Sequence, residues 1–326
     1  MAIKRSVSFY SYQQAYYTGR KTLEQLIEAT GKIVGSEGVE LIAEQMPVGS
    51  YPDPSDADVD RWFGWMARYG TTPTCMDSFI DWMLYKDRIL TRREQVDQMA
   101  RDLKLAARLG FKCIRVLCPV RKEIVEASIP IAEHYGVKMG LEIHAPMTLK
   151  SRWTLEYMDM VAKSGSKFAG LIPDFGIFAK RPARKMLDNA LKRGAKPAIL
   201  DAIVAACEAN ESIEKIISTV KKMGGGDAEM GVAMSWARNR FNPPDWLHDY
   251  APYIIHCHGK FYDMDEDCNE TGIDYETPIQ VLKDIGFNGY ISSEFEGQRL
   301  YLGDDEVDEI EQVRRHHVMM RRLIEA

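Results

Sequence analysis

The stretch RREQVDQMARDLKLAARLGFKCIRVLC, residues 92–118, decides the fold class of this chain. Its first part is amphipathic and predicts a helix over 92–110, with Thr91 as the N-cap and Gly110 at the C-terminal end. Its second part, FKCIRVLC, is a short apolar run that predicts a strand over 111–118. A helix that ends at glycine just before a strand is typical of the βαβ units that build parallel sheets.

The same unit recurs along most of the chain. Helical patterns cover 22–34 and 56–70, and glycine again precedes the next strand at Gly70, Gly136 and Gly286. Eight such units predict a closed (β/α)₈ TIM barrel of the α/β class, not an open doubly wound sheet. No Gly-rich GxGxxG or P-loop sequence follows a strand, which argues against a dinucleotide or a nucleoside triphosphate as the ligand. The predicted strands are SVSFYSY (6–12), GVELIAEQ (38–45), TTPTCMDSF (71–79), FKCIRVLC (111–118), VKMGLEIH (137–144), FAGLIPDF (168–175), YIIHCHGKF (253–261) and GYISSEF (289–295).

One connection departs from the pattern, because the sixth and seventh predicted strands are much farther apart than one helix requires. Three helices are predicted in this gap, over 196–210, 211–226 and 229–241. We therefore expect a single TIM-barrel domain over 1–326 with a helical insertion between strands 6 and 7. The insertion, 177–250, follows a barrel strand and should lie on the catalytic face as a lid or a partner surface. The tail, 307–326, predicts the eighth helix of the barrel.

Composition narrows the class of partner and the compartment. The 42 Lys and Arg against 48 Asp and Glu give a net charge of −6 without a basic stretch, which argues against nucleic acid. No apolar run approaches the roughly 20 residues of a membrane helix, and the N-terminus lacks the apolar core of a signal peptide. The six cysteines form no CxxC pair and read as reduced, packed side chains, so we expect a cytoplasmic protein: Cys75, Cys113, Cys118, Cys207, Cys257 and Cys268.

Acidic and imidazole side chains gather at the ends of four consecutive predicted strands. Strand side chains alternate between two faces, so the members of each pair on one strand share a face. Because buried charges need a partner or a metal, the set favours a divalent cation. Oxygen and nitrogen donors suit Mn²⁺, Mg²⁺, Co²⁺ or Zn²⁺, with no thiolate to select zinc. The positions are Glu142 and His144, Asp174, His256 and His258, and Glu294 and Glu296.

Each of these residues has an ordinary explanation when it is taken alone. Glu142 or Glu294 could be an ion-paired carboxylate at a strand end, and Asp174 after proline would usually cap a turn. His144 could be a structural histidine that bonds a carbonyl. The functional reading depends on seven such positions occurring at four successive strand ends.

These motifs resemble a known family. GLEIH, IPDFG, HCHGK and SSEFEG, together with the first two strands, are similar to the xylose-isomerase-like, or sugar phosphate isomerase/epimerase, TIM barrels. The resemblance implies one divalent metal bound by Glu142, Asp174, His258 and Glu294, and Mn²⁺ is the preferred ion. In this family the seventh strand often reads His-x-His-x-Lys-Asp, whereas Phe261 stands here in place of the aspartate. Because of this departure, either His258 or His256 could be the metal ligand. We prefer His258, in which case His256 would support a ligand or bind substrate.

A narrower resemblance covers residues 51–91, the EIHAP motif (142–146) and the long insertion, which are similar to the α subunits of C-glycoside deglycosidases. Those are metal-dependent barrels that cleave the carbon–carbon bond between a 3-oxo-sugar and an aromatic aglycone, and they work with a small β subunit. The resemblance implies a lyase acting by β-elimination, with a sugar or 3-oxo-C-glycoside as substrate and a β subunit as a partner. The alternative is a ketose 3-epimerase or sugar isomerase with the same metal site. Barrels of this family also commonly form oligomers.

The two functions assign the acid–base chemistry differently. In the lyase, His144 is the better base, since imidazole transfers protons near neutral pH. In an epimerase, Glu142 and Glu294 form the acid–base pair. Two roles are open for Lys260, which could steady an enolate oxygen or pair with Asp263. Glu296 could orient a ligand, bond a sugar hydroxyl or face solvent.

Two further groups of residues are interpreted as structural. The cluster Arg314, Arg315, His316 and His317 reads as a solvated face of the last helix. For the aromatic residues Phe79, Trp82 and Tyr85, core packing is favoured over contact with an aglycone or a partner protein.

Overall fold

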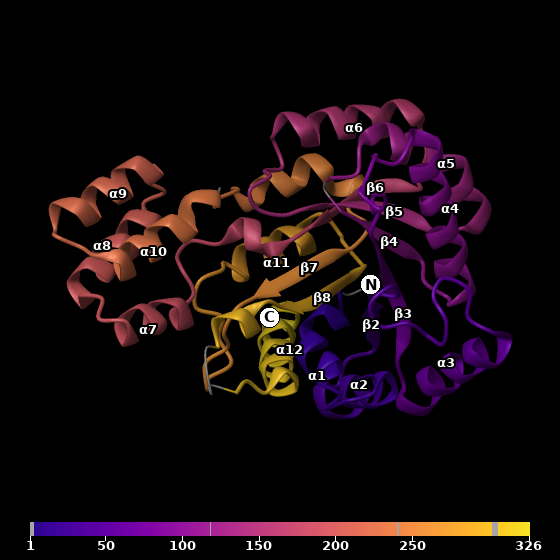
Figure 1. The fold of residues 1–326 in the computed structure, drawn as a ribbon, viewed down its shortest axis with the longest axis horizontal. Helices are drawn as coiled ribbons and strands as arrows, with labels where there is room; N and C mark the ends of the chain where they lie inside the picture. Colours follow the sequence, from indigo (N-terminus) through magenta and orange to yellow (C-terminus); the bar gives the residue numbers. More distant parts are fainter. Residues whose placement is uncertain (1–2, 118, 240, 302–305) are drawn as a thin grey trace.

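Eight parallel strands form a barrel with helices outside it (Figure 1). The computed structural model describes residues 3–117, 119–239, 241–301 and 306–326. The strand order is β6-β5-β4-β3-β2-β1-β8-β7, and parallel bridges from Leu171 to Ile254 and from Asp174 to His258 connect β6 with β7. The ring is therefore nearly closed, and the predicted TIM barrel is confirmed.

The strands are β1 (Lys4–Ser8), β2 (Gly38–Leu41), β3 (Thr72–Ser78), β4 (Cys113–Val116), β5 (Lys138–Ile143), β6 (Ala169–Pro173), β7 (Cys257–Phe261) and β8 (Tyr290–Phe295). The α-helices are α1 (Gln13–Tyr17), α2 (Leu23–Ala29), α3 (Asp56–Tyr69), α4 (Arg92–Arg108), α5 (Lys122–Tyr135), α6 (Arg152–Ser164), α7 (Arg184–Lys192), α8 (Pro197–Glu208), α9 (Ile213–Lys222), α10 (Asp227–Ser235), α11 (Glu276–Asp284) and α12 (Glu309–Glu325). Short 3₁₀ segments are η1 (Phe9–Tyr12), η3 (Phe175–Phe178), η4 (Trp236–Arg238), η5 (Pro244–Tyr253) and η6 (Gly297–Leu300), and η2 (Thr30–Val34) is a π-helical turn.

Local signals explain why the elements begin and end where they do. Thr91 caps α4 in a reciprocal capping box with Glu94. Gly110 follows the helix with φ of 84°, a left-handed conformation that glycine adopts without a Cβ clash. The predicted strand at 6–12 is shorter in the structure, because the chain turns into η1 directly after Ser8. These signals set the parallel strands so that all their carboxyl ends lie at one rim.

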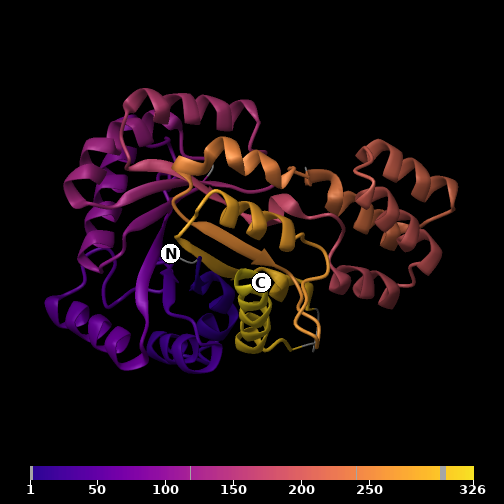
Figure 2. The same ribbon diagram turned by 180° about the vertical axis from the view of Figure 1, so that it is seen from behind.

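The chain between β6 and β7 contains α7, α8, α9 and α10. These helices stand beside the barrel in both views (Figures 1 and 2). They enclose an apolar cluster distinct from the barrel core, which includes Ala190, Ile203, Ile216, Val220 and Val232. The helices therefore pack mainly on one another.

The prediction of a solvated face on the last helix is wrong for its histidines. His316 has no exposed surface and stacks on Phe261 with ring centroids 4.2 Å apart. His317 is 1% exposed, and its Nε2 donates to the carbonyl of Ser6 at 3.2 Å. The two histidines thus join α12 to the outer side of the barrel strands.

Other structural expectations have mixed outcomes. Core packing is wrong for Trp82 and Tyr85, which are 40% and 45% exposed, because they lie on the irregular connection between β3 and α4. Cys118 lies outside the described residues, and the other five cysteines are free thiols. Within the described parts of the chain, none of the helices has both the length and the apolar character to cross a membrane.

Candidate metal centre

Four of the predicted site residues converge at the carboxyl rim of the barrel. Glu142 lies near the end of β5, Asp174 follows β6, His258 is on β7 and Glu294 is on β8, and each is at most 1% exposed. One donor atom from each lies within 4.8 Å of the donor atoms of the others. Ligands bonded to one ion at about 2.0–2.2 Å would have a comparable mutual spacing.

His258 contacts carboxylates through both of its ring nitrogens. Its Nδ1 lies 2.8 Å from Glu142 Oε1 and 3.5 Å from Glu294 Oε1, while its Nε2 lies 3.0 Å from Glu40 Oε1. Burial disfavours a charge on this ring, but Glu40, Glu294 and Glu142 outweigh it and raise the pKa of His258 well above its ordinary value. A metal ligated at Nδ1 would take the place of the proton on that nitrogen.

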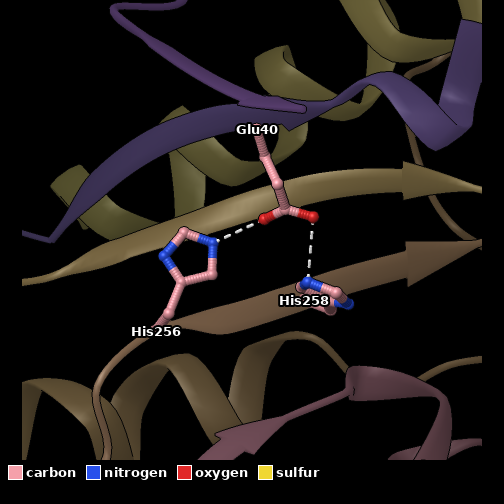
Figure 3. A group of neighbouring side chains, drawn as sticks. All are labelled: Glu40, His256 and His258. Carbon is pink, nitrogen blue, oxygen red and sulfur yellow. Dashed lines mark hydrogen bonds and ion pairs between the residues drawn. The ribbon is translucent and has the colours of Figure 1, made fainter. Parts of the chain in front are cut away.

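Glu40 lies between the rings of His256 and His258 (Figure 3). Its second oxygen, Oε2, lies 2.9 Å from His256 Nε2, which is also 2.8 Å from the hydroxyl of Ser292. His256 therefore supports Glu40, and it does not line the cavity at the rim. Of the two candidate histidines, His258 is the one that the structure places among the three other proposed ligands.

A buried arginine on β4 holds three acidic groups together. Arg115 is 4% exposed, and its Nε lies 2.8 Å from Asp77 Oδ1. Its Nη1 donates to Glu142 Oε2 at 3.1 Å and lies 3.8 Å from Glu294 Oε1. Burial acts to raise the pKa of Glu142, but Arg115 and His258 outweigh it and lower that pKa below its ordinary value. Arg115 thus keeps a proposed ligand ionised and ready to bind a cation.

Lys260 contacts the opposite side of the cluster. Its Nζ lies 3.1 Å from Asp174 Oδ2, 3.4 Å from Glu294 Oε2 and 3.1 Å from Glu296 Oε1. The alternative pairing with Asp263 does not occur, since Asp263 bonds Arg184 at 2.8 Å. Glu296 also bonds Arg299 at 3.0 Å, so it is a charged bridge at the edge of the site.

His144 lines the same cavity as Glu142, Asp174 and Glu294. Its Nδ1 lies 2.7 Å from the carbonyl oxygen of Ala145. A carbonyl only accepts, so the hydrogen of the neutral ring belongs on Nδ1 and the basic lone pair on Nε2. The hydrogen bond to the carbonyl, expected for a structural histidine, is therefore compatible with the predicted function of His144 as a base.

The charge balance of the site tests whether a cation fits. Five buried carboxyl groups face the two permanent cations Arg115 and Lys260 and the imidazole of His258. Burial raises the pKa of Asp174 well above its ordinary value, and Glu294 and Glu142 add to the rise against Lys260. Burial likewise raises the pKa of Asp77 to about 8 against the pull of Arg115. This excess of negative charge is what a divalent cation offsets, so the residues present fit a metal. The five carboxyl groups belong to Glu40, Asp77, Glu142, Asp174 and Glu294.

Sequence reasoning missed three residues of this network, namely Glu40, Asp77 and Arg115. Each is a charged residue inside a short apolar strand pattern, in GVELIAEQ, TTPTCMDSF and FKCIRVLC. Such a residue is rarely buried without a partner. This signal was present in the sequence and pointed to the same barrel interior.

The fold and the site define the class of protein. The sequence pattern of the xylose isomerase-like TIM barrel family matches residues 29–184, and the chain belongs to this family. It is 32% identical to the C-glycoside deglycosidase alpha subunit of Arthrobacter globiformis, over 99% of this chain and 93% of that protein. It is 28% identical to the 3'-dehydrocarminate deglycosidase alpha subunit of a Microbacterium species, over 97% and 94% of the two chains.

A solved structure shows the same fold. The D-psicose 3-epimerase of Clostridium cellulolyticum H10, crystallised with D-tagatose, superposes with a TM-score of 0.59 and 13% identity. The match covers 99% of this chain and all of that one. At this identity the likeness concerns the fold alone.

Proposed function

We propose that this chain is a divalent-metal-dependent enzyme that removes a proton from the carbon next to a sugar carbonyl. Specifically, we propose a C-glycoside deglycosidase alpha subunit that cleaves the carbon–carbon bond of 3-oxo-C-glycosides by β-elimination. The observation that carries the proposal is one cavity lined by His144, a candidate base, and by Glu142, Asp174 and Glu294 of the candidate metal group. The names of the two relatives and their coverage of nearly the whole chain support the choice of reaction.

The proposed ligands are Glu142, Asp174, His258 and Glu294, and Mn²⁺ is the metal we favour over Mg²⁺, Co²⁺ and Zn²⁺. Their three carboxylates and one imidazole offer only hard or intermediate donors. When bound, such an ion polarises the sugar carbonyl and makes the neighbouring C–H more acidic. The ligand carboxylates Glu142 and Glu294 would thus also serve catalysis.

The proton transfer is assigned to His144. Its Nε2 lone pair takes the proton from C2 of the 3-oxo-sugar, and the electron pair left on C2 forms the enolate with C3. Return of that pair re-forms the C3 carbonyl, makes the C1–C2 double bond and breaks the bond from C1 to the aryl carbon. The aryl carbon takes up a proton, which balances the one removed by His144. Lys260 is proposed to steady the negative oxygen, since its ammonium lies in the same cavity.

A ketose 3-epimerase or sugar isomerase is the second candidate. Glu142 and Glu294 both approach His258 Nδ1, at 2.8 Å and 3.5 Å, from two different strands. Two carboxylates so placed could exchange a proton on either face of a ketose. In that reaction His256, which lies outside the cavity lining, would act only through Glu40.

We propose that a smaller second subunit binds this chain, which itself assembles as an oligomer in the cytoplasm. The relatives are named alpha subunits, and apolar side chains are exposed over residues 82–89, such as Met83 at 64% and Ile89 at 58%. The five free cysteines suit a reducing compartment. Residues 1–326 are proposed as one catalytic domain, with 177–250 as its lid or partner surface.

The test is proton NMR in D₂O on reactions of the Mn²⁺-loaded protein, quenched with chelator, with a 3-oxo-C-glucoside and, separately, with free ketoses. We expect release of the aglycone, loss of release in His144→Ala, and unchanged release in His134→Ala, whose side chain is exposed on α5. His144→Ala should still bind Mn²⁺ in calorimetry. Deuterium entering a ketose with formation of its epimer, in place of aglycone release, would exclude the lyase and favour the epimerase.

A further inference from the structure

The cavity at the barrel rim has two chemically different parts. Its volume is about 520 Å³, within the roughly 300–1,000 Å³ typical of sites for drug-sized ligands. One part of its lining is the charged cluster at the ends of β5 to β8. Another part comes from the connection after β6 and the loop after β7. It includes the apolar side chains of Met186, Trp236 and Ile273, and beside them Arg181 and Asn239, which donate to main-chain carbonyls. Three of the proposed metal ligands, Glu142, Asp174 and Glu294, and these apolar side chains therefore face one continuous space.

This apolar wall is held in place by main-chain pairing. Ala179 and Ile273 form an antiparallel bridge, and the amide of Lys180 donates to the carbonyl of Gly272 at 2.8 Å. The returning chain is joined to the same segment, since the side-chain amide of Asn239 donates to the carbonyl of Ala179 at 3.2 Å. The beginning and the end of the insertion are thus both anchored at the cavity.

Trp236 and Met186 lie where the two apolar cores meet. Trp236 packs against the barrel core and against the core of the inserted helices. Met186 belongs to the second of these clusters, and its sulfur is 3.0 Å from the hydroxyl of Ser235, the residue before Trp236. Both side chains are only partly buried, so they retain surface that a ligand can cover.

The chemistry of this wall suits an aromatic ring better than a sugar. A sugar needs hydrogen-bonding partners for its hydroxyls, which the charged part of the cavity supplies through Lys260 and Glu296. A thioether, an indole ring and an aliphatic side chain instead favour a flat apolar group, through sulfur–aromatic and ring–ring contacts.

We infer that Met186, Trp236 and Ile273 form the subsite for the aryl aglycone, so that the two ends of the insertion select aryl-C-glycosides over free ketoses. This inference rests on the proposed deglycosidase function, whose sugar part would occupy the charged side of the same cavity. The insertion then contributes to substrate choice through its ends, while the bodies of α8 and α9 stand away from the barrel (Figure 1).

The test is equilibrium binding of a hydroxyflavone to the full-length protein in calorimetry. EDTA is present throughout, so that flavone hydroxyls cannot bind through a metal. We expect Trp236→Ala and Met186→Ala to weaken flavone binding by about tenfold or more, because each removes a side chain of the proposed aryl subsite. Matched controls are Trp153→Ala and Met234→Ala, which lie outside the cavity lining and are 42% and 52% exposed. They should bind the flavone like the wild type.

The inference is overturned if the wild type does not bind the flavone, or if both cavity variants bind it as tightly as the wild type. Should Trp236→Ala fail to fold, Trp236→Phe and Met186→Lys provide the same comparison. Met186→Lys does so by placing a charge in the proposed aryl subsite. Aglycone release from a 3-oxo-C-glucoside by the Mn²⁺-loaded protein is measured separately. Release with unchanged flavone binding in the variants refutes the subsite alone. Weakened flavone binding in the variants without release by the wild type refutes cleavage by this chain on its own and supports the aryl site.

Discussion

Replacing Glu40 by glutamine should weaken Mn²⁺ binding while leaving all four proposed ligands in place. Glu40 has no exposed surface, and its oxygens lie 3.0 Å from His258 Nε2 and 2.9 Å from His256 Nε2. A carboxylate only accepts, so His256 donates its Nε2–H to Oε2, while Oε1 forms an ion pair with the Nε2–H of His258. With its hydrogen held on Nε2, a neutral His258 presents the lone pair on Nδ1 to the metal.

Glutamine cannot accept from both rings, because one of its two polar atoms is a donor. If the amide faces His258, it favours a ring with hydrogen on Nδ1, which is the wrong tautomer for ligation. If the oxygen faces His258, the amide meets the N–H of His256. In either case one buried contact of the carboxylate is lost, the hydrogen bond from His256 or the ion pair with His258, worth about 1.5–3 kcal/mol. The dissociation constant for Mn²⁺ should therefore rise by about 10–100-fold.

The assay is calorimetric titration of Mn²⁺ into chelator-treated wild type, Glu40→Gln and Glu37→Gln. Glu37 lies three residues earlier and its side chain is exposed, so its variant removes the same charge outside the network. The control should match the wild type. A folded Glu40→Gln protein that binds Mn²⁺ within about twofold of the wild type would refute the reasoning.

Two further predictions concern stability. Arg115→Met leaves the buried carboxylate of Glu142 without its cation and removes the partner of the Asp77 carboxyl group, so it should lower the free energy of unfolding by about 3–5 kcal/mol in denaturant titrations. A loss no larger than that of the exposed control Arg92→Met would contradict this expectation. Burial lowers the pKa of His317 from 6.5 to about 3, with Arg5 adding to the effect, so the unfolded chain takes up a proton below pH 6.5 that the folded protein excludes. Between pH 7.5 and 5.0 the wild type should thus lose about 2 kcal/mol more of its free energy of unfolding than His317→Gln does. Equal losses in the wild type, in His317→Gln and in the exposed control His134→Gln would contradict a neutral, buried His317.

Much of the fold could be predicted, because its signals are local. The capping sequence at Thr91 and the glycine at position 110 act within one turn of α4 and set where the next strand begins. Element boundaries were less certain where a strand passes directly into a short helix, as at Ser8. The periodicity of an apolar run does not show how far the strand can remain paired with its neighbours.

Part of the site could be predicted from the sequence for a similar reason. Alternation along β5 and β8 places Glu142 and Glu294 on inward faces, and parallel strands bring their ends to one rim. The burial of His316 and His317 could not be predicted from the sequence. A helix pattern that mixes arginine and histidine does not show which side faces the strands, and here the histidines face Phe261 and the carbonyl of Ser6.

The barrel class and the strand ends that carry carboxylate and imidazole groups thus follow from the order of residues, because periodicity and helix termination depend on neighbours in the chain. Contacts between distant residues account for the rest. They join Glu40, Asp77 and Arg115 to the candidate metal centre and place His258 among the carboxylates, with His256 behind Glu40. They also bring Met186 and Trp236 to the cavity. Burying a charge requires a partner of suitable geometry, and which strand supplies that partner is settled only when the barrel closes.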